Sequence, residues 1–153
     1  MSEETFEPEI LAIACEFRGY PAADVAGAMH LQYPPNVRIV RLPCTGKTDV
    51  LYLLKAFEKG ADAVFVAGCK KGICHYLEGN YAAERRVKYV KQLLDQIGLG
   101  SERLEMFFMT AADGGKFADA VREMTERARR LGPNPLHQKA ANASAVDAKG
   151  ENR

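Results

Sequence analysis

The sequence has no excess of charge of either sign and no long apolar run. Its 153 residues carry a formal net charge of +1 at pH 7. With so small a charge, no bulk electrostatic attraction to nucleic acid or to a membrane surface is expected. No apolar stretch approaches the roughly 20 residues that cross a bilayer. We therefore expect a protein with no nucleic-acid partner and no membrane span.

The first residues lack the positive charge that is typical of a secretory signal peptide. The chain begins Met-Ser-Glu-Glu and remains acidic as far as Glu9. This composition predicts a cytoplasmic protein. In that reducing compartment, the four cysteines of the chain indicate metal binding or redox chemistry more than structural disulfides.

Familiar catalytic patterns are also missing. The sequence has no G-x-G-x-x-G fingerprint for a dinucleotide, and no serine–histidine–carboxylate set or carboxylate pair can be argued from it. Thr45-Gly-Lys-Thr48 looks like the end of a phosphate-binding loop, but Arg41 stands where the first glycine of that motif is required. No independent active site can therefore be argued from the sequence.

What the chain does contain is an alternation of strand-like and helix-like segments. Apolar runs of strand length occupy 10–15, 37–43, 61–68 and 104–110. Helical periodicity follows each of them, at about 22–32, 50–59, 79–97 and 116–131. In the first helix, the buried face is expected to carry Val25, Ala28, Met29 and Gln32.

This alternation predicts one α/β domain over residues 10–132. Its parallel sheet of four strands should carry helices on both faces, as in flavodoxin-like and Rossmann-like folds, with strand order 2-1-3-4. Residues 1–9 are expected to form a flexible lead-in. Residues 133–153 are expected to form a mobile C-terminal tail, because the end of the chain is rich in alanine and polar residues and has no apolar period.

All four cysteines fall at or after the ends of predicted strands. Cys15 ends the first strand, Cys44 follows the second, Cys69 ends the third, and Cys74 lies in the next loop. Because parallel strands end at one edge of a sheet, the four thiols should converge there. Four thiolates suit either tetrahedral zinc or an iron–sulfur cluster.

Other interpretations of the cysteines remain open. They could be four small buried hydrophobic residues, or Cys69 and Cys74 could form a redox pair, although such pairs usually have two residues between them rather than four. Lys47, Lys70 and Lys71 could favour thiolates, or could simply belong to solvated loops. His75 could be a spare ligand or a surface residue.

Several strings in the sequence resemble one known family, the delta subunit of methyl-viologen-reducing hydrogenase, also called the hydrogenase iron–sulfur subunit. The most specific string is Gly68-Cys-Lys-Lys-Gly-Ile-Cys-His-Tyr-Leu-Glu-Gly-Asn-Tyr81. The resemblance runs from about residue 9 to residue 132 and also includes the segments 31–41, 44–47, 60–62 and 84–88.

The resemblance implies a small electron-transfer subunit of anaerobic metabolism, including methanogenesis, that carries a 2Fe–2S cluster. Its iron ligands would be Cys15, Cys44, Cys69 and Cys74. Such subunits pass electrons between a hydrogenase or formate dehydrogenase and the flavoprotein A-subunit of heterodisulfide reductase, so those proteins are the expected partners.

The chain departs from the family at one place. Near the end of the first strand, the family usually has the pattern C-C-x-x-C. This chain has Ala14 and Arg18 in place of two of those cysteines, so that only Cys15 remains. Four thiols still suffice if Cys15 is a ligand, and His75 is a possible substitute. The alternatives are a cluster-free adaptor that docks through the basic segment 85–91 and the C-terminal tail, and a structural zinc site.

Overall fold

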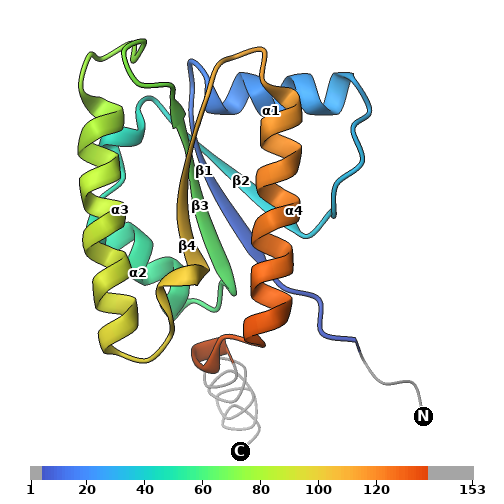
Figure 1. Ribbon diagram of the computed structural model, residues 1–153, viewed down its shortest axis with the longest axis vertical. Helices are drawn as coiled ribbons and strands as arrows, with labels where there is room; N and C mark the ends of the chain where they lie inside the picture. The colour runs from blue at the N-terminus through green and yellow to red at the C-terminus, as the bar shows by residue number, and fades with distance from the viewer. Residues whose placement is uncertain (1–4, 138–153) are drawn as a thin grey trace, which may run out of the picture.

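The computed structural model describes residues 5–137, which form a sheet with helices on both of its faces (Figure 1). None of the described helices has both the length and the apolar character needed to cross a membrane. The elements are β1 (Ile10–Cys15), α1 (Gly19–Ala28), β2 (Val37–Leu42), the short 3₁₀ helix η1 (Thr45–Lys47), α2 (Val50–Glu58), β3 (Ala63–Cys69), α3 (Gly79–Gln96), the 3₁₀ helix η2 (Ser101–Arg103), β4 (Leu104–Met109) and α4 (Gly114–Leu131).

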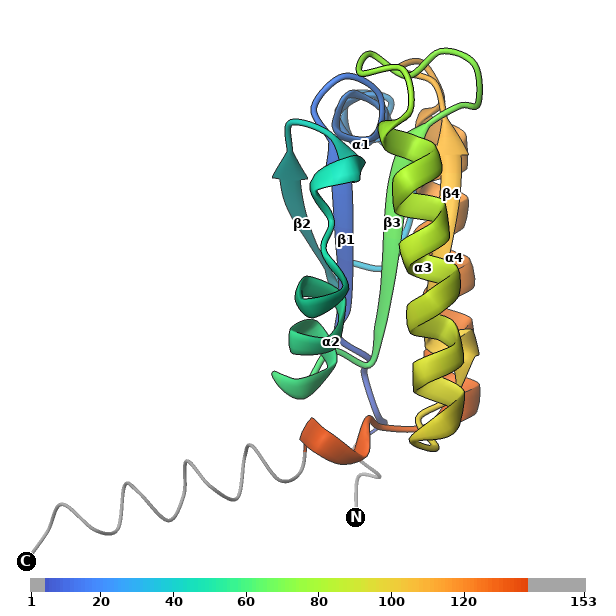
Figure 2. The ribbon, with the colours of Figure 1, turned by 90° about the vertical axis from the view of Figure 1, so that its left-hand side faces the viewer.

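The four strands are all parallel and are arranged in the order β2-β1-β3-β4, which confirms the predicted topology. In the register of the sheet, Ile10 lies opposite both Val37 and Ala63. Parallel pairing brings the carboxyl ends of the strands to one edge, where the loops into η1, α1, α3 and α4 gather at the top of Figures 1 and 2.

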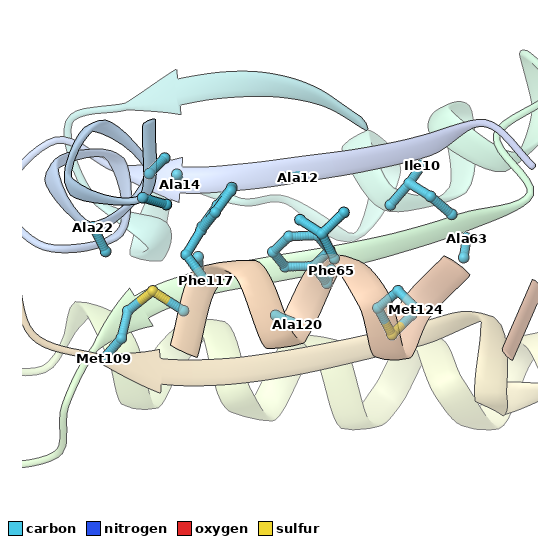
Figure 3. Close-up of a cluster of buried hydrophobic side chains, with 14 of the residues drawn as sticks. Ile10, Ala12, Ala14, Ala22, Ala63, Phe65, Met109, Phe117, Ala120 and Met124 are labelled. Carbon is cyan, nitrogen blue, oxygen red and sulfur yellow. The ribbon is translucent and has the colours of Figure 1, made fainter. Parts of the chain in front are cut away.

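The core has two layers because successive strand residues point to opposite faces of the sheet. On one face, Ala12 and Phe65 pack against α1 and α4, including Phe117 (Figure 3). On the other face, Ile13 and Val64 belong to the layer beneath α2 and α3. Each large apolar side chain that is fully buried contributes about 1.5–3 kcal/mol to folding.

Helix α1 lies unusually close to the sheet at the edge that carries the cysteines. A Cβ atom on Gly19 would stand only 2.2 Å from the carbonyl oxygen of Ala67 in β3. Ala22 and Ala26, one and two turns further along, are fully buried. Small residues therefore let the N-terminus of α1 rest on the ends of β1 and β3.

The predicted position of this helix was wrong at both ends. The helix begins at Gly19 and ends at Ala28 rather than covering 22–32. It ends early because His30 takes a left-handed conformation with φ of 52°, and the Leu31 amide donates to the Ala26 carbonyl. Met29, predicted to be buried, is 63% exposed, and the buried face consists of alanines instead, which the close approach to the sheet requires.

The packed part of the chain continues beyond the predicted boundary at residue 132. Asn134 is fully buried, and its side-chain amide donates to the carbonyls of Phe57 and Ala61, each at 2.8 Å. Its backbone amide donates to the carboxylate of Asp62. Residues 133–137 therefore pack against the domain. The rest of the predicted tail, 138–153, and residues 1–4 of the predicted lead-in lie outside the described residues.

Candidate metal centre

The four cysteines lie together at the carboxyl edge of the sheet. Cys15 and Cys69 are the last residues of β1 and β3, Cys44 immediately precedes η1, and Cys74 lies in the loop from β3 to α3. Their side chains form a single cluster, in which Cys44 is half-buried and the other three are buried. The convergence predicted from the strand ends is present, and all four cysteines are in the thiol form.

One pair of sulfur atoms already has a spacing that a metal ion could use. The Sγ atoms of Cys15 and Cys69 are 3.6 Å apart. Two thiolates that share one tetrahedral metal ion with bonds of about 2.3 Å are about 3.8 Å apart. The ends of β1 and β3 therefore hold two thiols at nearly the separation of two ligands on one ion.

Backbone amides at the starts of helices point at two of the sulfur atoms. The amide of Gly19, the first residue of α1, donates to Cys15 Sγ at 3.2 Å. The amide of Gly46 in η1 donates to Cys44 Sγ at 3.3 Å. Unpaired amides at a helix N-terminus carry partial positive charge, which stabilises a thiolate or another anionic sulfur species.

The N-terminus of α3 also reaches the sulfur cluster, and only glycine fits there. A Cβ atom on Gly79 would lie 2.1 Å from Cys44 Sγ and 3.6 Å from Cys74 Sγ. Gly46 packs against the same residue, since its own Cβ would be 2.9 Å from Gly79 Cα. These two glycines let η1 and α3 meet around the sulfurs of Cys44 and Cys74.

The environment of Cys74 favours its thiolate. Burial raises the pKa of this thiol, but the nearby backbone amides of Asn80, Tyr76 and Gly79 outweigh that effect and lower its pKa below the ordinary value. An arrangement of several amides around one sulfur is the kind of nest that binds anions in proteins.

Cys69 and Cys44 are held as neutral thiols in the absence of a cation. Burial raises the pKa of Cys69 to about 12, and the neighbouring thiol of Cys15 adds to the increase. Burial also raises the pKa of Cys44, with the Gly46 amide opposing it and the adjacent Cys74 adding to it. A bound cation would reverse this preference, because it stabilises every thiolate that contacts it.

The four thiols have the number and type of donor that a thiolate-bound metal group requires. Within residues 5–137, however, no group of three or more His, Cys, Asp or Glu side chains is already placed to hold a metal ion. Cysteine has one side-chain torsion with three staggered positions. Binding would therefore require the thiols to rotate about χ1, while their backbone positions are already together.

Ala14 and Arg18, which stand where the resemblance implies cysteines, have different surroundings. Ala14 is fully buried in the core layer beneath α1 and α4, near Ala22 (Figure 3), on the opposite face of β1 from its neighbour Cys15. Arg18 is half-buried just before α1, and its guanidinium donates to the carbonyl of Phe17 at 3.0 Å. Position 14 therefore faces away from the sulfur cluster, whereas position 18 lies in the turn that follows Cys15.

The remaining candidates from the sequence lie beside the cluster. The ring of His75 is exposed and stacks on Phe17 with the ring centres 3.7 Å apart. Its backbone amide, not its ring, interacts with the Cys69 thiol and opposes the rise in the pKa of that thiol. Its role as a substitute ligand stays a prediction. Lys71 is paired with Glu84 at 3.1 Å, so its charge is directed toward α3.

Two residues that hold this site together escaped the sequence reasoning. Asn80 and Arg86 contact the backbone next to the cysteines from α3. Arg86 fell within the basic segment 85–91 that was predicted to dock a partner. Asn80 could have been noticed as a polar residue at the start of a helix that directly follows a cysteine loop.

The fold and the site define a flavodoxin-like α/β domain whose ligand edge is lined by thiols. The chain belongs to the family described as methyl-viologen-reducing hydrogenase, delta subunit, whose family model matches residues 10–132.

Individual relatives agree with this assignment. The chain is 59% identical to the iron-sulfur D-subunit of the vhu F420-non-reducing hydrogenase from Methanococcus maripaludis, over 85% of this chain and 97% of that protein. Identity and coverage are the same for the D-subunit of the vhu hydrogenase from Methanocaldococcus jannaschii. The chain is also 35% identical to the A-subunit of the ferredoxin/F420H2-dependent CoB-CoM heterodisulfide reductase from Methanosarcina acetivorans, over 82% of this chain but only 16% of that much longer protein.

The raised pKa of Cys69 predicts that the metal-free chain loses stability at alkaline pH. The ordinary thiol pKa is 9.0 and the folded value is about 12, so the unfolded chain releases this proton first as the pH rises. The contribution of Cys69 to stability is complete below about pH 9 and is lost progressively as the pH rises toward about 12. Urea unfolding at several alkaline pH values should show this loss.

The Cys69→Ala variant is the control for that measurement. It lacks the titrating thiol, so its free energy of unfolding should fall less steeply with pH than that of the parent chain. Equal slopes for the two proteins would contradict the raised pKa.

Proposed function

We propose that this protein is an electron-transfer subunit whose Cys15, Cys44, Cys69 and Cys74 bind a 2Fe–2S cluster. The observation that carries the proposal is the single side-chain cluster of all four cysteines at the ligand edge of a parallel sheet. When bound, such a cluster supplies a one-electron redox couple. Similarity to the iron-sulfur D-subunits of hydrogenases supports the same cofactor class.

The residues around the cysteines suit that role. The amides of Gly19 and Gly46 donate to sulfur and would help to offset the negative charge of a thiolate-bound centre. Three of the thiols are buried, which keeps water from them, whereas Cys44 is half-buried and lines a surface pocket of about 300 Å³ with Lys47 and Tyr76. Electrons would enter or leave on this side, where a sulfur atom is within reach of a partner.

The partners that we propose are a hydrogenase or formate dehydrogenase on one side and a heterodisulfide-reductase A-type flavoprotein on the other. Relatives named as hydrogenase subunits support the first partner. The second is supported by the relatives named as A-subunits of heterodisulfide reductases, in which a segment similar to this chain forms part of a longer protein. We place this exchange in the cytoplasm, where thiols remain reduced.

A cluster-free adaptor is the second candidate function. It is favoured by Arg18, which lies in the turn after Cys15 where the resemblance implies a cysteine, and by the absence of a ready-made liganding arrangement among residues 5–137. In this case the chain would hold the same partners together without carrying electrons itself. A structural zinc site would use the same four thiols. Metal analysis separates the three possibilities.

The Cys69→Ser variant should lose the cofactor. Anaerobically purified parent protein is expected to contain about two irons and two acid-labile sulfides per chain, whereas the variant should contain little of either, because a hydroxyl is a poor substitute for a thiolate ligand. Iron, sulfide and zinc are measured together on the same samples.

Ala14→Cys is the matched control, since it adds a thiol beside Cys15 but on the opposite face of β1. It should leave the iron and sulfide content unchanged. Full iron and sulfide in Cys69→Ser would refute the ligand role of Cys69. A folded parent protein without iron would favour the adaptor, and one equivalent of zinc would favour the structural site.

The loop that covers Cys74 offers an apolar surface for a partner. Ile73, Tyr76 and Leu77 are 41%, 52% and 80% exposed. Leu77 also has a left-handed backbone with φ of 63°, a conformation that costs a non-glycine residue about 1–3 kcal/mol. Exposed apolar groups and local strain at one site are more easily explained by a binding role than by stability of the isolated chain.

The Leu77→Ser variant should bind the A-type flavoprotein at least about 10-fold more weakly, because burying a leucine side chain against a partner contributes about 1.5–3 kcal/mol. Binding of the loaded chain to that purified flavoprotein can be measured by calorimetry. Ile97→Ser is the control, since Ile97 is 63% exposed at the far end of α3. Equal weakening by the two variants would contradict a specific role for this loop.

A further inference from the structure

We propose that Arg86 is a positioning residue that clamps the turn carrying Cys44 and thereby sets this sulfur opposite Cys74. The inference rests on the four-cysteine site of the proposed function and adds a residue that lies outside the set of cysteines. Arg86 lies in α3, two turns after Gly79, and is half-buried against η1.

The guanidinium of Arg86 donates hydrogen bonds to backbone carbonyls of the turn. Its Nη1 atom donates to the carbonyl of Gly46 and, at 3.2 Å, to the carbonyl of Thr48. These two acceptors flank Lys47, and the amide of Gly46 is the group that donates to Cys44 Sγ. A short chain of contacts therefore leads from the side chain of Arg86 through one peptide segment to the sulfur atom.

The Cys44 turn needs such an anchor more than the other cysteine segments do. It follows β2, the strand at the edge of the sheet, which pairs only with β1. Cys44 is also the one thiol of the cluster that is not fully buried. The buried Thr45 seats the turn against Gly68 of β3, and α3 contacts the turn at Gly79 and, about 10 Å further along the helix, at Arg86.

The same helix also fixes the end of β3. Asn80 is fully buried, and its side-chain amide donates to the carbonyls of Cys69 at 2.9 Å and Lys70 at 3.3 Å. Cys74 lies in the loop that leads into α3. Helix α3 is thus connected to the backbone next to Cys44, Cys69 and Cys74, and the side chain of Arg86 makes its hydrogen bonds to the Cys44 turn.

Arginine suits this role for a geometric reason. Both carbonyls accept from Nη1, whose two N–H bonds have directions fixed by the planar guanidinium, whereas the donors of lysine rotate on a flexible stem. Arg86→Lys keeps the charge and removes these fixed directions. Arg85→Lys makes the same chemical change at the neighbouring exposed position and is the matched control.

The test uses the full chain in its metal-free, reduced form, with Co²⁺ as an optical probe of thiolate ligation. Arg86→Lys should bind Co²⁺ about 10- to 100-fold more weakly than the parent chain, the range typical when a residue that orients a ligand is replaced. Its Cys44 thiol, followed by mass spectrometry after alkylation, should react several-fold faster. Arg85→Lys should match the parent chain in both measurements, and the unfolding temperature of each variant should change by only a few degrees.

The outcomes separate this inference from the proposed function. If the parent chain binds Co²⁺ through thiolates and Arg86→Lys does so equally well, with unchanged Cys44 reactivity, Arg86 positions nothing and the inference fails while the cysteine site stands. If the parent chain shows no thiolate bands with Co²⁺, the cysteine site fails, and Cys44 reactivity alone decides the role of Arg86. An Arg86→Lys chain that does not fold also overturns the inference, because the proposed role is local to the Cys44 turn.

Discussion

Parallel pairing of the four strands is the constraint on which the site depends. Strands that run in one direction end at one edge of the sheet, so cysteines separated by as many as 59 residues, Cys15 and Cys74, meet there without a local sequence motif. Cys15 and Cys69 end the neighbouring strands β1 and β3, and their sulfurs lie 3.6 Å apart. A shift of one strand along the other would separate this pair even if every cysteine were kept.

The start of a helix lies beside most of these thiols, and its backbone amides supply the hydrogen bonds that a buried sulfur does not receive from water. Burial alone raises the pKa of a thiol and disfavours the thiolate, as at Cys69. Backbone amides in η1 and around the start of α3 oppose that effect at Cys44 and Cys74, and the first amide of α1 donates to the sulfur of Cys15. The close approach is possible because Gly79 and Gly46 have no Cβ atoms, so glycine is a steric requirement of the site.

The sequence was sufficient to predict the topology and the placement of the cysteines, because both follow from the period of the apolar residues and the order of the strands. It misplaced α1, whose buried face consists of Ala22, Ala23 and Ala26 rather than larger residues, since the need for close packing against Ala67 is visible only in three dimensions. It also missed Asn80 and Arg86. Their partners are backbone carbonyls far away in the sequence, and such contacts leave no periodic signal.

The central claim is that four thiolates of this chain, and no other side chain, bind the iron. X-ray absorption at the iron edge of the anaerobically purified protein tests this claim most directly. We expect a first shell of sulfur alone together with one short iron–iron distance, as in a 2Fe–2S cluster with four cysteine ligands. A nitrogen or oxygen atom in the first shell, such as the ring nitrogen of His75, or a protein that holds no iron at all, would contradict it.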